Sequence, residues 1–141
     1  MSAATAFAPV FVMVALTFVL LFSAGIARAR ALRAGEVREK DIALREPNWP
    51  ERPTQLINAY QNQLELPVLY YLVVVAAFFS ANMTGPMLAL SWAFVVARLA
   101  HAAVHVTSNR LRLRFMTFVA GLVILMAMWA LFLLQLLLAP A

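Results

Sequence analysis

The chain has 141 residues, of which 65% are hydrophobic and 12% are charged, and its formal net charge at pH 7 is +5. A soluble domain usually carries about 25% charged residues, so most of this surface is expected to face something other than water. The chain has no cysteine, which excludes disulfides, thiolate metal sites and a cysteine nucleophile. Because the basic residues flank apolar segments, we interpret the positive charge as a membrane-topology signal and expect no nucleic-acid partner.

Four apolar segments, separated by short polar stretches, predict four membrane-spanning helices in a single domain over residues 1–141. The first segment has no basic residue ahead of it and is longer than the apolar part of a secretory signal, so we expect a retained helix. The predicted fold class is all-α integral membrane, a four-helix bundle in the lipid bilayer. The expected spans are residues 7–27, 57–80, 87–107 and 115–138.

The first span is followed by the one long loop of the prediction, residues 28–54, which is mixed in charge and contains Pro47, Pro50 and Pro53. Prolines at this density disfavour regular structure. The second helix is expected to begin near Pro53, because proline is tolerated in a first helical turn. Pro67 lies inside this helix and is expected to kink it.

The lysines and arginines predict the orientation of the chain. Outside the spans, all of them fall within residues 28–54 or residues 108–114, whereas both termini and the turn at residues 80–86 have none. Loops rich in basic residues stay in the cytoplasm. We therefore expect both basic loops to be cytoplasmic and both termini to be periplasmic, in a bacterial inner membrane.

Two helices carry polar residues inside their apolar patterns. Spacings of three and four residues place each set on one helix face. An ionised side chain at mid-bilayer costs a few kcal/mol, so such a face is expected to turn toward protein or a water-filled cavity. These residues are Asn58, Asn62 and Glu65 on the second helix, and Arg98, His101 and His105 on the third.

Glu65 and Arg98 are expected to form an ion pair, within one chain or between chains. Glu65 is as far beyond Pro53 as Arg98 is before Arg110, so at 1.5 Å per residue each lies roughly 18 Å from its cytoplasmic end. Glu65 is also the one acidic residue outside the long loop. Such a pair could set helix register or belong to a functional site, and the sequence does not decide between the two.

His101 and His105 are spaced i, i+4, which suits a metal ion or a haem iron. The alternative is two polar residues hydrogen-bonded at a helix interface. We favour this alternative, with no metal site, because the chain has no other histidine and no cysteine.

Arg110, Arg112 and Arg114 follow as a basic cluster, of the kind that fixes topology or contacts anionic lipid. Beside the polar face of the third helix, this cluster would form a cationic groove for a small anionic ligand.

Two motifs resemble those of a known family. The first is Asn-Gln-Leu-Glu-Leu-Pro at residues 62–67, and the second is Arg-Leu-Ala-His-Ala-Ala-Val-His at residues 98–105, followed by Asn109, Arg110 and Arg114. They are similar to the second-helix and third-helix motifs of the membrane-associated proteins in eicosanoid and glutathione metabolism, the MAPEG family. The first motif is very similar to a run in the bacterial branch.

The resemblance implies a homotrimer of four-helix subunits, with glutathione as co-substrate bound between neighbours near the cytoplasmic face. In the family, residues of the two motifs and of the basic loop line that site. The glutathione-binding residues expected here are Asn58, Asn62, Glu65, Arg98, His101 and His105.

In this family, an arginine of the same region stabilises the glutathione thiolate, because a nearby guanidinium favours the charged sulfur. Arg110, Arg112 and Arg114 are the candidates for this catalytic role, and spacing does not choose among them. Family transferases usually carry Arg at the position of Asn58, and many carry Tyr at the position of His105.

The resemblance implies a glutathione-dependent transferase or peroxidase acting on lipophilic electrophiles dissolved in the bilayer. The alternative is a non-catalytic member of the same fold, which belongs to a larger membrane assembly or binds lipid. The nearly featureless first and fourth helices favour this alternative, because they offer apolar surface to a partner. A transporter is a third possibility, but the sequence lacks the internal repeats and broken helices typical of transporters.

Overall fold

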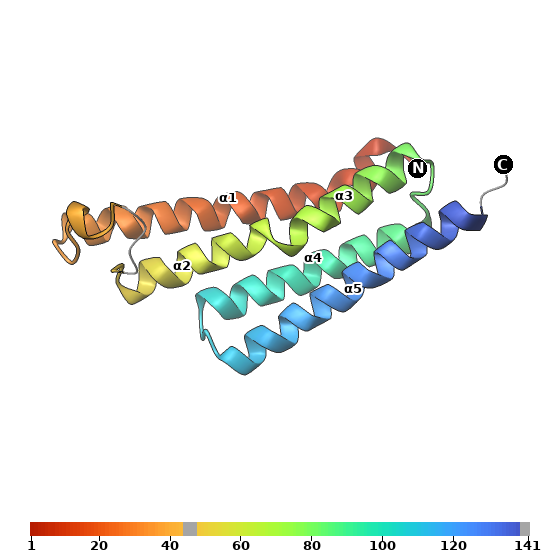
Figure 1. Cartoon of the computed structure of the whole chain (residues 1–141). Coiled ribbons are helices and arrows are strands. Elements are labelled where there is room, and N and C mark those ends of the chain that lie inside the picture. The colour runs from red at the N-terminus through yellow and green to blue at the C-terminus, as the bar shows by residue number, and fades with distance from the viewer. Residues whose placement is uncertain (44–47, 139–141) are drawn as a thin grey trace.

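The computed structural model describes residues 1–43 and 48–138 and is helical, without a strand in those two ranges (Figure 1). Four of its helical stretches are long and apolar enough to cross a membrane, which confirms the predicted all-α fold class. Arg45 and Pro47, which we assigned to the long loop, lie outside the described residues.

The four spans, of which α2 and α3 together form the second, run in alternating directions, so the start of α1 and the end of α5 lie at the same end of the bundle (Figure 1). In chain order the elements are α1 (Ala3–Arg33), the short 3-10 helix η1 (Glu39–Asp41), α2 (Glu51–Gln61), the 3-10 helix η2 (Asn62–Leu64), α3 (Leu66–Phe79), α4 (Gly85–Val106) and α5 (Leu111–Leu138).

Two expectations about the loops are corrected. The long loop is not free of regular structure, because η1 forms where Arg38 and Asp41 pair across one turn. The second basic loop, predicted over residues 108–114, is shorter, because α5 already begins at Leu111. The leucines and arginines at its start are good helix formers, so the helix extends beyond the apolar segment.

The second span is a broken helix. In place of the kinked helix that we predicted, α2 ends at Gln61, η2 follows, and Glu65 has φ −101° and ψ −102°, well outside the helical region. Pro67, in the first turn of α3, is the cause, since proline has no N–H and its ring collides with the carbonyl group four residues earlier. The carbonyl groups of residues 62–65 therefore lose regular helical partners.

The buried core lies between α1, α3, α4 and α5. Tyr70 of α3 stacks on Phe94 of α4 with ring centroids 4.6 Å apart, and its hydroxyl is 2.8 Å from that of Ser91. Helices in lipid associate through close packing and such interhelical hydrogen bonds. Large apolar side chains such as Phe79 and Leu137 stay exposed on the outside, as expected for a surface that faces acyl chains.

Candidate functional site

Arg98 lies at the centre of the polar residues that the fold brings together. The residue is fully buried on α4, and its Nη2 donates a hydrogen bond of 2.7 Å to the carbonyl oxygen of Asn62. The broken second span supplies this acceptor. The Nε and Nη1 atoms of Arg98 have no hydrogen-bond partner among the described residues, so they can bind a ligand or a neighbouring subunit.

The ion pair that we expected between Glu65 and Arg98 is wrong for a single chain. Within residues 1–43 and 48–138 the one salt bridge joins Arg38 to Asp41 on the surface. The hydrogen bond and charge of Asp41 raise the pKa of Arg38. Glu65 is exposed, and it lies at the break itself, where its φ and ψ are outside the helical region. A pair between chains remains a prediction.

His101 connects α4 to the first turns of α5. The residue is buried, and its Nδ1 is 3.1 Å from the carbonyl oxygen of Arg114 and 3.1 Å from Oγ1 of Thr117. A carbonyl oxygen only accepts, so Nδ1 carries the hydrogen and Nε2 is an acceptor. This Nε2 has no partner in the described part of the chain. His105 is buried beside it, with ring centroids 5.8 Å apart.

A cavity of about 170 Å³ opens beside these residues, and Arg114 forms one of its walls. Asn109 adopts a positive φ of 48°, which asparagine tolerates better than most residues, and this turn ends α4 and leads into α5. The Oδ1 of Asn109 then accepts a hydrogen bond of 2.8 Å from Nη1 of Arg114, which fixes the guanidinium. The lining residues are Asn62, His101, Leu111, Arg114, Phe115 and Phe118.

The other predicted site residues lie outside this cavity. Arg110 and Arg112 are exposed and do not line it. Asn58 is also exposed, and only its backbone carbonyl takes part, accepting a hydrogen bond of 3.0 Å from Nδ2 of Asn62. In one chain, the predicted polar face of the second helix is therefore divided: Asn62 lies inward, and Asn58 and Glu65 lie outward.

Three polar residues near the site were not predicted. Gln63 is 1% exposed, and neither end of its amide has a partner among the described residues. Thr117 contacts His101, and the side chain of Gln55 donates a hydrogen bond of 2.7 Å to the carbonyl oxygen of His105. Thr117 and Gln135 are the two polar residues in the predicted fourth span, residues 115–138, so the sequence did mark Thr117 as unusual. Gln63 lies off the face of Asn62 and Glu65 in a regular helix, and only the break buries it.

A protein-family model described as the MAPEG family matches residues 6–134 of the chain. No curated protein and no solved structure matches the chain significantly. The matched residues include α2, η2 and α4 and most of α5, which contribute the site.

Proposed function

The chain belongs to the MAPEG family of membrane four-helix bundles, known for glutathione-dependent transferases and peroxidases, and from this premise we propose that it is such an enzyme, acting on lipophilic electrophiles. One observation carries the proposal. Asn62, His101 and Arg114 meet around a single cavity, and Arg98 is bonded directly to its wall.

The polar atoms around this cavity suit glutathione. Arg98 Nη1 and Arg114 Nε are buried donors and His101 Nε2 is a buried acceptor, each without a partner in the described ranges. A buried polar group without a partner costs about 1–3 kcal/mol, so a ligand that satisfies these atoms is favoured. Glutathione has carboxylates for the guanidinium groups and amide N–H groups for the imidazole acceptor.

A neighbouring subunit would complete the site. The cavity of 170 Å³ is smaller than the roughly 300–1,000 Å³ of typical ligand pockets, so one chain holds only part of a tripeptide. Asn58 and Glu65 are exposed within the second span, where a polar group in contact with lipid is unfavourable. A homotrimer, as the family implies, would cover both residues and extend the pocket between subunits.

Arg114 is the arginine that we assign to the thiolate, because of the three candidates only Arg114 lines the cavity. A guanidinium beside the sulfur favours the charged form and lowers the pKa of the thiol. The thiol proton passes to water or to His101 Nε2. The thiolate then forms a carbon–sulfur bond with an electrophile that enters from the bilayer, while the leaving group departs with its electron pair.

The proposed orientation fits this chemistry. With both basic loops in the cytoplasm of a bacterial cell and both termini in the periplasm, the cavity at the α4–α5 turn opens toward the compartment that contains reduced thiols. The apolar outer surface of the bundle would admit the second substrate by lateral diffusion, which selects for lipophilic molecules.

The test is a glutathione titration of the detergent-solubilised protein, read by thiolate absorbance in the ultraviolet near pH 7. Parent protein is expected to give a saturable thiolate signal. Arg114→Ala should raise the pKa of the bound thiol by about one unit, which reduces the bound thiolate by up to about tenfold near pH 7. Arg112→Ala is the matched control: it removes the same charge two residues away, outside the cavity, and should leave the signal unchanged.

A well-folded parent oligomer that does not bind millimolar glutathione would contradict the proposal. The exposed apolar faces of α1 and α5 would then favour the second candidate, a non-catalytic subunit of a larger membrane assembly. If Arg114→Ala and Arg112→Ala lost the thiolate signal equally, glutathione binding could stand but the assignment of the thiolate to Arg114 would be contradicted.

A further inference from the structure

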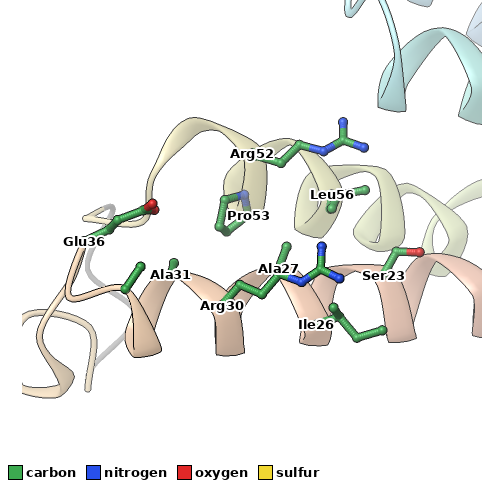
Figure 2. A pocket seen from close by; sticks show the side chains of 10 residues that line it. Ser23, Ile26, Ala27, Arg30, Ala31, Glu36, Arg52, Pro53 and Leu56 are labelled. Atoms are coloured by element: carbon green, nitrogen blue, oxygen red, sulfur yellow. The ribbon is translucent and has the colours of Figure 1, made fainter.

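A second cavity, of about 490 Å³, lies between α1 and α2 and shares no lining residue with the cavity at Arg114 (Figure 2). Its volume is within the range of typical small-molecule sites. The proposed glutathione chemistry does not use it. The lining residues are Ser23, Ile26, Ala27, Arg30, Ala31, Ala34, Glu36, Arg52, Pro53 and Leu56.

The lining changes from apolar to charged along α1. Ile26 and Ala27 line one end, Arg30 follows one turn later, and Glu36 lies at the far end, near the start of α2 (Figure 2). Neither Arg30 nor Glu36 forms an ion pair within the described ranges. Arg52, on α2, is held in place because its Nη1 donates to the carbonyl oxygen of Val106 at 2.6 Å.

This cavity is at the level of the membrane surface. The guanidinium carbon of Arg28 lies 4.6 Å from the ring centroid of Trp49, and tryptophan and arginine side chains prefer the lipid headgroup region. On the membrane side, Phe18, Phe22 and Ile26 are 52%, 65% and 53% exposed and are spaced four residues apart. They form an apolar stripe on α1 that ends at the cavity.

We propose that this cavity binds one membrane phospholipid with an amino headgroup. The phosphate lies beside the guanidinium of Arg30, which points into the space between α1 and α2 (Figure 2) and can form strong charge-assisted hydrogen bonds. An acyl chain follows the apolar stripe of Phe22 and Ile26. The headgroup ammonium reaches Glu36, so that Arg30 and the carboxylate share a zwitterionic partner.

The lipid's two charged groups explain why both signs of charge line one cavity. A phosphate alone would be repelled by Glu36, and an apolar ligand would form no ion pair with Arg30 or Glu36. Phosphatidylethanolamine provides both charges and can donate hydrogen bonds to the carboxylate. Phosphatidylcholine carries the same charges, but its quaternary ammonium has no N–H to donate.

The experiment is native mass spectrometry of the full chain in detergent, titrated separately with phosphatidylethanolamine, phosphatidylcholine and phosphatidylglycerol. Parent protein should bind phosphatidylethanolamine at one molecule per chain and in preference to the other two. Arg30→Gln should weaken its binding about tenfold, the effect of one lost charge-assisted bond. Glu36→Gln should keep the binding but remove the preference for phosphatidylethanolamine.

Two further variants distinguish lipid binding in this cavity from general attraction between the lipid and the basic end of α1. Arg33→Gln makes the same charge change on the same helix, outside the cavity, and should bind like the parent. Ala27→Phe fills the cavity without changing charge and should abolish binding, while glutathione binding shows that the protein is folded.

Equal losses for Arg30→Gln and Arg33→Gln would overturn the proposal in favour of general charge attraction. Displacement of the lipid by inorganic phosphate would overturn it in favour of a free-anion site. A parent oligomer that binds none of the three lipids would also overturn the proposal.

Discussion

Single residues explain how a charged side chain is tolerated inside an apolar bundle. Arg98 is fully buried, and it has one strong acceptor because the break before Pro67 frees the carbonyl group of Asn62. The remaining guanidinium atoms have no partner in the described part of the chain. Glu65 has the opposite situation, a carboxylate exposed at the depth of the membrane. Each residue therefore needs a partner that one chain does not supply.

Glu65 and Arg98 are predicted to be coupled across a subunit boundary. Glu65→Gln and Arg98→Gln should each destabilise the oligomer by about 3–5 kcal/mol, because each leaves a buried charge alone. The variant that carries both substitutions should lose no more stability than either single variant. Thermal unfolding of the four proteins in detergent provides the double-mutant cycle. Strictly additive losses would contradict the coupling.

At the scale of elements, α4 and α5 form the wall on which the site is built, and Gly121 of α5 faces Phe94, Ala97 and Arg98 of α4. A Cβ atom at Gly121 would lie 3.6 Å from Cδ of Arg98 and 3.9 Å from Cε2 of Phe94, which is ordinary van der Waals contact. The space therefore accepts one methyl group, and a larger side chain at this position would meet the stem of Arg98.

Gly121→Ala is predicted to leave the thermal stability unchanged or to raise it by up to about 1 kcal/mol, because alanine removes the entropic cost of glycine in a helix. Gly121→Leu should lower it by about 1–3 kcal/mol through overpacking and should also weaken glutathione binding by displacing Arg98. Gly25→Leu is the control, since a Cβ there meets nothing within 4 Å. A Gly121→Leu protein as stable as its parent would contradict this account of the helix contact.

At the scale of elements, the sequence pattern predicted the number of spans but not the shape of the second span. The apolar periods and Pro67 predicted four spans and a distortion in the second one. They did not predict that the distortion would be a break over residues 62–65, because one missing N–H allows either a smooth kink or a break. The choice depends on Arg98, which binds a carbonyl group of the break from another helix.

For the whole molecule, the arrangement of the helices brings the long basic loop and the α4–α5 turn to one end of the bundle (Figure 1). The beginning of α1 and the α3–α4 turn lie at the other end. Charge in short loops decides orientation during insertion, so the basic end is expected in the cytoplasm.

Single cysteines in this cysteine-free chain test the orientation without background labelling. Gly85→Cys places a thiol at the start of α4, where a Cβ meets nothing within 4 Å, and Ser108→Cys places one on the exposed turn after α4. A membrane-impermeant maleimide should label Gly85→Cys on intact spheroplasts and should label Ser108→Cys only after permeabilisation. The reverse pattern would show that the basic loops are outside.

The sequence by itself determined the class of this protein, its four spans and the polar residues that cannot face lipid, because these depend on local composition and helical period. Only the tertiary structure decided which polar residues meet. Within the described residues Glu65 is exposed and forms no salt bridge with Arg98, and Arg114 lines the cavity because the turn at Asn109 places the first helical turn of α5 beside His101. Helical period assigns a residue to a face, but the direction of that face after a break or a turn depends on contacts between distant segments.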